Sequence, residues 1–193
     1  MKIESIVNFL KVIEQFKTCE RTCRTTDNSR PESDAEHTWH LATFFLLLED
    51  AFEDIDFNKV LKIALIHDLP EIFAGDTNPY RGDTSNKEEN EKQAAQKLFS
   101  LLPDNPRRSF EALFQEYLEQ NTIESQIVKS ADKLMPLIQN ICTNKTYSSY
   151  RELEVQHQEV KDYMDSYFQS DGILRDFYTR LLDEAKRKGV FYS

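Results

Sequence analysis

The stretch 64-ALIHDLPEIFAGD-76 places one histidine, three carboxylates and a proline inside an otherwise apolar run. Ionisable groups are costly to bury unless opposite charges or hydrogen-bond partners accompany them. His67 and Asp68 are adjacent, so on a helix their side chains would point about 100° apart. They could reach one common ion only near a helix end, and only with partners from other segments of the chain.

The same stretch predicts where a helix ends. Apolar residues and His67 recur at helical spacing over 60–67. Pro70 lacks a backbone N–H and restricts Leu69, so the helix should end or kink there. A short helical turn through Phe73 would then close at Gly75.

Helical spacing extends through most of the chain. Ser33 and Glu36 form a capping box, in which each side chain satisfies a backbone group at a helix start. Strand-like runs of Val, Ile and Thr are scarce, which predicts an all-α bundle of roughly seven to eight helices. Besides the helix that ends near Pro70, helices are expected near 3–16, 34–51, 86–102, 106–120, 123–143, 149–169 and 172–188, and the polar segment from Thr18 to Pro31 is expected to be a loop.

The chain of 193 residues is long enough for one domain with a sizeable core. We expect a single domain over 1–193, with a core at about 30–145 and C-terminal helices at about 149–188 packed on it. No run approaches the roughly 20 apolar residues of a membrane span, and Lys and Glu interrupt the N-terminal segment where a signal peptide would be apolar. Three cysteines without a disulfide framework fit a reducing compartment, so the expected location is cytoplasmic.

The charge balance limits the ligand classes. A formal net charge of −10 and a pI near 4.9 would repel a polyphosphate backbone. Long DNA or RNA is therefore not an expected ligand. A small anion such as a single phosphate is compatible with the sequence, because a local metal ion or an arginine pair can outweigh the global charge.

Two further residues could complete a site with His67 and Asp68. His37 lies one turn into the helix that the capping box begins, and Asp132 lies inside the largely apolar stretch 128-VKSADKLMPLI-138. Two imidazoles and two carboxylates suit one divalent ion such as Mn, Co, Fe or Zn, with Mg less natural. Open coordination positions could then hold water and a phosphate oxygen.

These motifs carry a resemblance to a known family. The segments AEH at 35–37, HD at 67–68 with EIFAGD following, and SADKL at 130–134 resemble the HD-domain metal-dependent phosphohydrolases, whose signature has the order H…HD…D. RPES at 30–33 and the short HDLPEIFAGD spacing are similar to the 5′-deoxynucleotidase branch, over roughly residues 1–145. The resemblance implies a homodimer that hydrolyses a small phosphorylated substrate, a nucleoside 5′-monophosphate, to nucleoside and phosphate. It assigns the divalent metal to His37, His67, Asp68 and Asp132.

The resemblance also assigns roles around that metal. Glu71 would orient the attacking water or protonate the leaving oxygen. Asp76, at the pocket rim, would contact the sugar or the leaving oxygen. Arg30, and one of Arg21 or Arg24, could clamp the phosphate, because a guanidinium binds phosphate oxygens through two donors.

One departure from that branch concerns sugar preference. The deoxynucleotidases carry an Arg-Trp pair seven to eight residues before the arginine matched by Arg30, and the tryptophan helps to exclude 2′-hydroxyls. This chain has Thr22 and Cys23 there, and its one tryptophan, Trp39, lies on the helix of His37.

Simpler interpretations exist for each residue. His67 and Asp68 could be a helix-terminal histidine beside a capping aspartate. Asp132 could pair at the surface with Lys129 or Lys133. The three arginines could be charges on a flexible loop. The order of the motifs favours the metal site over these readings.

Three alternatives to a nucleoside monophosphatase remain. An HD hydrolase could act on a triphosphate, a cyclic nucleotide or guanosine tetraphosphate. The fold could also serve as a non-catalytic nucleotide or metal sensor. Finally, residues 19–40 contain a spacing close to that of a zinc finger, C-x3-C-x13-H-x2-H, but the intervening TDNSRPESD lacks the apolar residues that a finger needs.

Overall fold

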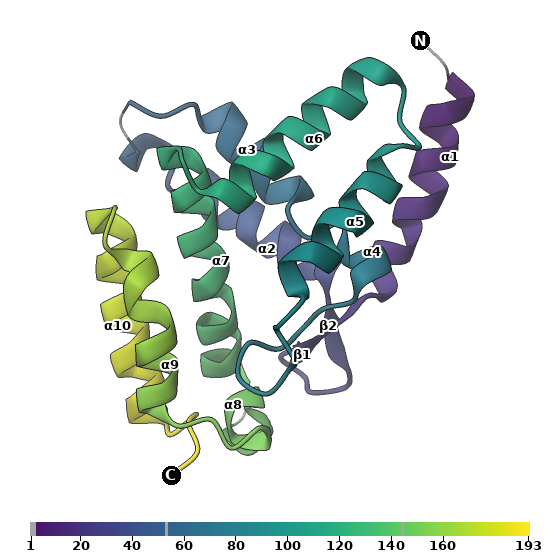
Figure 1. Cartoon of the computed structure of the whole chain (residues 1–193). Coiled ribbons are helices and arrows are strands. Elements are labelled where there is room, and N and C mark those ends of the chain that lie inside the picture. The colour runs from purple at the N-terminus through teal and green to yellow at the C-terminus, as the bar shows by residue number, and fades with distance from the viewer. Residues whose placement is uncertain (1–2, 53, 144) are drawn as a thin grey trace.

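The computed structural model describes residues 3–52, 54–143 and 145–193, and helices dominate it (Figure 1). Short 3-10 turns occur at Glu14–Thr18, Glu49–Ala51, Lys145–Tyr147 and Asp165–Phe168. The predicted all-α class is confirmed. The α-helices are α1 (Ile3–Ile13), α2 (Asp34–Leu47), α3 (Phe57–Ile66), α4 (Glu71–Ala74), α5 (Lys87–Phe99), α6 (Asp104–Glu119), α7 (Ile123–Cys142), α8 (Ser149–Glu152), α9 (His157–Met164) and α10 (Gly172–Lys188).

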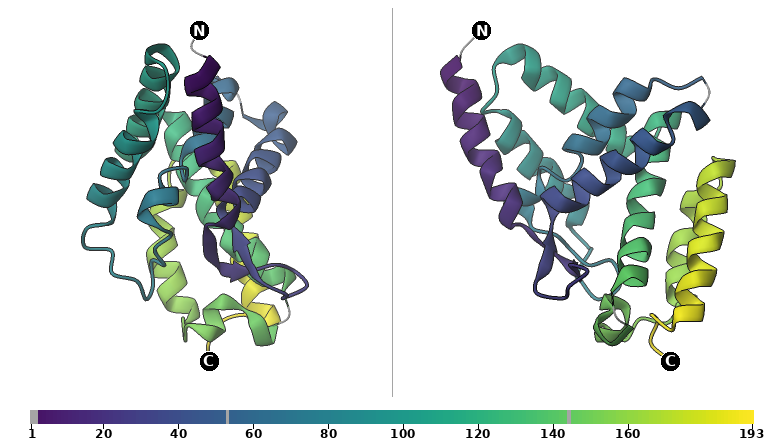
Figure 2. Two further views of the ribbon diagram at one scale, coloured as in Figure 1. Left: turned by 90° about the vertical axis from the view of Figure 1, so that its right-hand side faces the viewer. Right: turned by 180° about the vertical axis from the view of Figure 1, so that it is seen from behind.

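Helix α7 is the element around which the other helices pack. It contacts α2, α3, α6 and α10. Figures 1 and 2 show it running between the α9–α10 pair and the helices on the opposite side of the molecule. Its apolar residues are buried around most of its circumference, as expected of a core helix. A carboxylate in the middle of α7, such as that of Asp132, is therefore held inside the protein.

The predicted capping box begins α2. Ser33 Oγ accepts a hydrogen bond of 3.3 Å from the backbone N–H of Glu36, and the backbone N–H of Ser33 donates to the Glu36 carboxylate at 3.0 Å. This reciprocal pair satisfies donors that a helix start leaves free. It fixes the first turn of α2, from which His37 points into the interior with 1% of its surface exposed.

The predicted break after His67 is confirmed. Helix α3 ends at Ile66, and Pro70 directly precedes α4. Gly75 closes α4 with φ +77° and ψ 150°, a conformation that is essentially restricted to glycine. The turn over 67–70 carries His67 and Asp68 toward the interior, and α4 begins at Glu71, one turn further on.

The expected loop from Thr18 to Pro31 was wrong in part, because the chain forms a hairpin there. Strand β1 (Glu20–Arg24) pairs antiparallel with β2 (Pro31–Ser33). The strands are short and polar, and only Cys23 on β1 is buried, so the sequence lacks the alternation that marks a strand. Contacts of β1 with α7 and α8 hold the hairpin in place.

The continuous helix expected at 149–169 was also wrong. Helices α8 and α9 are separated by Glu154, which adopts φ +54°, and by the fully buried Val155. The N–H of Val155 donates to the Tyr150 carbonyl, and the Val155 carbonyl accepts from Tyr192 near the C-terminus. Burial of one valine and its backbone pairing outweigh helix propensity at this point.

The core has two parts. The larger part lies mainly between α2, α3, α7 and α10, and the smaller part between α1, α5 and α6. The end of α3 spans both, because Ile63 packs in the larger part and Ile66 and Leu69 pack in the smaller. The segment of His67 and Asp68 therefore lies where the two parts meet. Within the described residues, no helix is long and apolar enough to cross a bilayer.

Candidate metal centre and adjoining pocket

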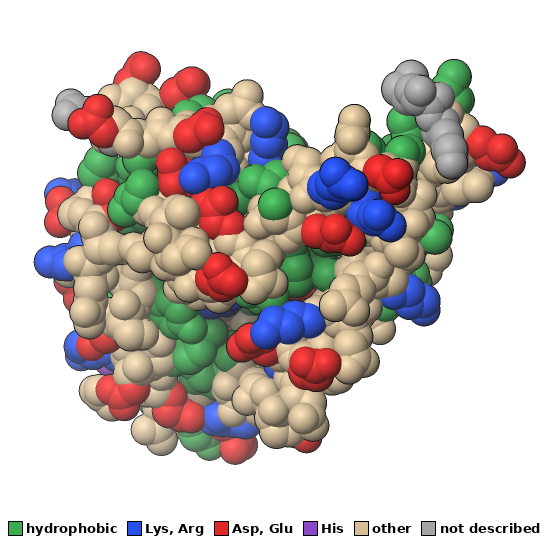
Figure 3. Space-filling model, turned by 45° about the horizontal axis from the view of Figure 1, so that its top comes forward, with side chains coloured by type: hydrophobic (Ala, Val, Ile, Leu, Met, Phe, Trp, Pro, Cys, Tyr) green, Lys and Arg blue, Asp and Glu red, His purple; other side chains and the backbone are tan. Residues whose placement is uncertain are grey.

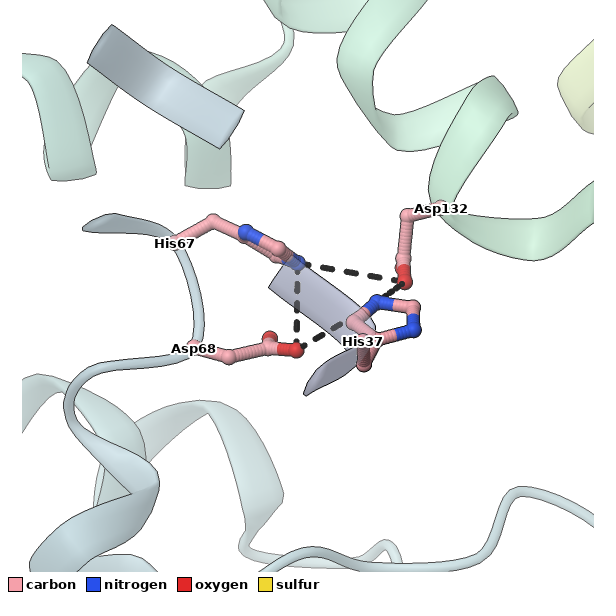
Figure 4. A group of neighbouring side chains, drawn as sticks. All are labelled: His37, His67, Asp68 and Asp132. Carbon is pink, nitrogen blue, oxygen red and sulfur yellow. Dashed lines mark hydrogen bonds and ion pairs between the residues drawn. The ribbon is translucent and has the colours of Figure 1, made fainter. Parts of the chain in front are cut away.

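Two histidines and two aspartates converge in the interior from three separate segments (Figure 4). His37 Nε2 lies 3.0 Å from Asp132 Oδ1 and 3.8 Å from Asp68 Oδ2. His67 Nε2 lies 3.1 Å from Asp68 Oδ2 and 3.8 Å from Asp132 Oδ1. One donor atom from each side chain lies within 4.8 Å of the other three. The structure thus brings together the four residues that the sequence indicated, in an arrangement that could hold a metal ion.

The hydrogen bonding of His67 fits a metal ligand. Its Nδ1 lies 2.9 Å from the carbonyl of Ala64, so Nδ1–H donates there and Nε2 carries the lone pair of the neutral ring. Nε2 is buried and faces Asp68 Oδ2 at 3.1 Å, although the pair does not have the geometry of a hydrogen bond. In the neutral ring a lone pair would face carboxylate oxygens, an arrangement that is costly unless a proton or a cation lies between them. A ring nitrogen held in this way, opposite a donor bond at Nδ1, is the usual arrangement of a histidine that ligates a metal.

Without a cation, the four side chains share protons unequally. Burial lowers the pKa of His67, but the carboxylates of Asp68 and Asp132 outweigh burial and raise it to about 9. Burial and Arg21 together lower the pKa of His37 to about 4. His67 would therefore carry the positive charge that two adjacent buried carboxylates require. A divalent ion could take the place of that proton, which ties metal binding to proton release.

Arg21 is the arginine that the structure places at this centre. Its Nη1 donates to Asp68 Oδ2 at 3.0 Å and to Asp34 Oδ1 at 3.1 Å. Arg24 instead donates to Asn28 in the hairpin turn. Arg30 forms a two-donor pair with the Glu36 carboxylate, at 2.5 and 2.8 Å. Of the three arginines proposed as phosphate ligands, Arg21 alone lines the cavity beside the metal centre.

A second carboxylate group adjoins the first. Asp34, Asp68 and Glu71 offer oxygens within 4.8 Å of one another. Burial and the neighbouring carboxylates, Asp68 first, raise the pKa of Glu71 well above its usual value. The same causes raise the pKa of Asp34 to about 6. Among the described residues, Glu71 Oε2 is buried without a hydrogen-bond partner, and Lys87 forms an ion pair with Oε1 at 3.9 Å. A buried carboxyl group that can hold or release a proton thus lies beside the candidate metal centre.

A cavity of about 610 Å³ opens onto these groups. His67, Asp68, Glu71 and Asp132 line it, and Asp76 lines it as well. Its volume lies within the range of small-molecule sites. The space is sufficient for a substrate of nucleotide size beside the metal centre.

Lysines of this cavity are functional candidates that the sequence did not reveal. Lys133 Nζ pairs with Asp132 Oδ2 at 2.8 Å, inside the protein instead of at the surface. Lys129, one turn earlier on α7, donates to Tyr117 Oη at 3.0 Å and lies 4.2 Å from the centroid of the Tyr117 ring. It forms no ion pair with a described carboxylate. The four-residue spacing from Lys129 to Lys133 was the available signal, but the direction in which α7 faces could not be read from it.

The zinc-finger spacing has no structural counterpart. Cys23 is buried in hydrogen-bonding range of Ser149 and Asn140, and burial raises the pKa of its thiol to about 11. Among the described residues, the cysteines join no cluster of potential metal ligands. His40 is half-buried, and His157 is half-buried and packs edge-on against Phe191.

The protein is a helical bundle that buries two histidines and two aspartates beside a polar cavity. It therefore has the features of helical proteins that hold a metal ion inside the bundle through histidine and aspartate side chains. The chain belongs to the HD domain family, whose model matches residues 13–171.

Named relatives span most of the chain. It is 30% identical over 166 residues to the human protein named 5′-deoxynucleotidase HDDC2. The matched region covers 84% of this chain and 76% of that protein. It is 28% identical over 181 residues to 5′-deoxynucleotidase hdd1 of Schizosaccharomyces pombe, with 86% and 89% covered. A crystal structure of a predicted metal-dependent phosphohydrolase from Magnetospirillum magnetotacticum superposes with a TM-score of 0.88 at 34% identity, over 100% of this chain and 99% of that one.

Proposed function

We propose that this protein is a divalent-metal-dependent phosphohydrolase that converts nucleoside 5′-monophosphates, including deoxyribonucleotides, into nucleoside and phosphate. The names of its relatives and its place in the HD domain family support the reaction class. The observation that carries the proposal is the convergence of four donor side chains beside a cavity, each with one donor atom within 4.8 Å of the other three: His37, His67, Asp68 and Asp132.

In this proposal His37, His67, Asp68 and Asp132 hold one divalent ion. Mixed nitrogen and oxygen donors favour Mn, Co, Fe or Zn over Mg. When bound, such an ion lowers the pKa of a coordinated water and shields the charge of the phosphate. The protein contributes fixed donors, because each ligand comes from a rigid helix or a helix end.

The cations of the cavity would bind the phosphate. Arg21 is anchored by Asp34 and Asp68, which fixes its guanidinium at the edge of the metal centre. Lys129 donates to Tyr117 Oη and forms no direct ion pair within the described part of the chain. Lys133, whose partner is Asp132, can approach the same anion. Phosphate binding thus falls to Arg21 and the lysines of α7, while Arg24 and Arg30 maintain the hairpin and its junction with α2.

Glu71 is the group that we assign to proton transfer during hydrolysis. It is buried, its Oε2 has no hydrogen-bond partner in the described structure, and it lies one turn beyond Asp68. It would position the attacking water or supply the proton to the leaving 5′-oxygen. Asp76, where the chain leaves α4, would contact the sugar or the same leaving oxygen.

We further propose that residues 1–193 form one domain and that the protein is a cytoplasmic homodimer. Its substrate would be a small anion and not a nucleic acid. The exposed apolar side chains of Trp39, Leu46 and Leu47 on α2 support self-association. Acidic and basic side chains are interspersed on the face in Figure 3, and the net charge is −10, which disfavours a polyphosphate ligand.

The test is phosphate release by metal-stripped protein from a panel of ribo- and deoxynucleoside monophosphates, with and without added Mn or Co. Asp68→Ala, checked for folding by circular dichroism, is the control. Metal-dependent release that the variant lacks is the expected result. Parallel incubations with nucleoside triphosphates should release neither pyrophosphate nor triphosphate, which separates this reaction from that of a triphosphate hydrolase. Failure to release phosphate from any monophosphate, despite stoichiometric metal binding, would refute the proposal.

A further inference from the structure

Tyrosine rings line the part of the cavity formed by the C-terminal helices. Tyr163 on α9 and Tyr167 in the following 3-10 turn are half-buried, and their ring centroids lie 5.6 Å apart. Tyr80, from the loop between α4 and α5, packs edge-on against Tyr163 at 5.3 Å. All three side chains line the cavity. We call these three residues the aromatic wall.

Lys133 links the aromatic wall to the candidate metal centre. Its ammonium lies 2.8 Å from Asp132 and 5.9 Å from the centroid of the Tyr167 ring. One side chain therefore spans the distance from a candidate metal ligand to an aromatic surface. A nucleotide has a related layout, since a ribose separates its charged phosphate from a flat base.

Packing alone does not account for the aromatic wall. Tyr150, whose ring lies 5.9 Å from that of Tyr80, also borders the cavity but is 3% exposed and belongs to the core. Tyr163 and Tyr167 stay partly open to the cavity, although the neighbouring Met164 and Phe168 are buried. The two tyrosines therefore present more ring surface to the cavity than the side chains beside them in the sequence.

We propose that the aromatic wall is the base-binding subsite, on which the base of the nucleotide stacks while its phosphate lies at the metal centre; this rests on the proposed function. Stacking on aromatic rings tolerates any base, because every base has a π face. The subsite would therefore favour esters whose leaving group carries an aromatic ring over bare sugar phosphates. It would discriminate weakly between purines and pyrimidines.

Two parts of the chain would then bind different parts of the nucleotide. Residues of β1, α2, α7 and the turn after α3 surround the phosphate, whereas α9, the turn after it and Tyr80 recognise the leaving group. The C-terminal segment would thus determine substrate preference without touching the metal ligands. Substitutions in the aromatic wall should change KM for nucleotides and leave the chemical step intact.

The experiment compares Tyr163→Leu, Tyr167→Leu and Tyr163→Phe with the parent protein, loaded with Mn. Tyr147→Leu, at a 44% exposed position that does not line the cavity, is the matched control. Each protein is assayed with a nucleoside monophosphate and with 2-deoxyribose 5-phosphate, which has no base. Calorimetry with a nucleoside 5′-phosphonate, which cannot be hydrolysed, measures binding independently of turnover.

Loss of one base–aromatic stack should raise KM for the nucleotide, and weaken phosphonate binding, about tenfold in the two leucine variants. Values of kcat, and KM for 2-deoxyribose 5-phosphate, should stay near those of the parent. Tyr163→Phe and Tyr147→Leu should resemble the parent on both substrates.

Two outcomes separate the inference from the proposed function. Nucleotide hydrolysis with the same KM and phosphonate affinity in both leucine variants would overturn the aromatic wall as a subsite while leaving the nucleotidase intact. Phosphonate binding that the leucine substitutions weaken, in a protein that hydrolyses no monophosphate, would support the subsite and refute the reaction. Equal loss on both substrates would indicate a structural role and also overturn the inference.

Discussion

The carboxylates around Arg21 differ in pKa, because burial and neighbouring cations act on each of them to a different extent. His67 and Arg21 hold the pKa of Asp68 below its usual value despite burial. Burial and three neighbouring carboxylates raise the pKa of Glu71 well above the usual range, although Arg21 opposes the shift. Side chains of the same chemical type can thus take different parts in one site, as ligand or as proton carrier.

At the residue scale, Glu71→Gln separates metal binding from proton transfer. The amide keeps the size of the side chain but cannot exchange a proton, so kcat should fall by about 100-fold or more. Affinity for Mn, measured by calorimetry, should remain near that of the parent, because Glu71 is outside the four-donor set. Glu91→Gln, which also lines the cavity, is the matched control. A parallel loss of metal affinity would instead make Glu71 a ligand.

Glu32 provides a pH-dependent prediction. Burial raises its pKa to about 7 in the folded protein, against a usual value of 4.5. The folded state therefore binds more protons than the unfolded state between these values, and wild-type stability falls as pH rises through this interval. Glu32→Gln removes that loss. Relative to wild type, the variant should gain about 2–3 kcal/mol in the free energy of unfolding between pH 4 and pH 8.

Urea unfolding at the two pH values measures this difference. Glu20→Gln, at an exposed position of β1, is the control and should show no comparable pH dependence. An equal effect of Glu32→Gln at both values would mean that Glu32 stays ionised in the folded state.

At the element scale, the sequence predicted what local chemistry determines and missed what distant contacts determine. The capping box of α2 and the break at Pro70 are encoded by neighbouring residues, so they could be predicted. The hairpin of β1 and β2 could not, because its polar strands are held by contacts with α7 and α8. That omission also left Arg21 undistinguished from Arg24 and Arg30, since only the pairing of the hairpin directs the Arg21 side chain at Asp68. The four candidate metal ligands were recognised through the order of their motifs, and the lysines of α7 were not.

Substitution of Gly75 tests the conformation of the short segment that carries Glu71 and Asp76. Its φ of +77° with ψ 150° strains any residue with a side chain, although no atom lies within 4 Å of an added Cβ. Gly75→Ala should therefore cost about 1–3 kcal/mol through backbone strain alone. Gly172→Ala, equally free of close atoms but at the start of α10, should be neutral or stabilising by up to about 1 kcal/mol.

Thermal unfolding of the two alanine variants provides the comparison. The Gly75 variant should also lose activity if the strain moves Asp76 from the cavity. Equal melting temperatures for both variants would show that the chain after α4 relaxes to another conformation.

At the scale of the whole molecule, the metal centre lies where the two parts of the core meet. His67 and Asp68 follow α3, whose end contributes to both parts, and Asp132 belongs to the central helix α7. An ion there would cross-link segments that are far apart in the chain. In its absence, buried carboxylates depend on the proton of His67 and on Arg21 and Lys133.

Metal binding should therefore raise global stability. At a free Mn concentration of 100 times the dissociation constant, linkage predicts about 2.7 kcal/mol of stabilisation. For a chain of this length that corresponds to a rise in melting temperature of roughly 5–10 °C over protein treated with a chelator.

Asp132→Asn removes one donor oxygen charge while keeping the side-chain volume, so its melting temperature should respond little to Mn. The shift should also diminish as the pH falls below about 9, because a proton on His67 then competes with the ion for Nε2. An equal Mn-dependent shift in Asp132→Asn would place the bound ion elsewhere in the protein, and the assignment of all four ligands would then fail.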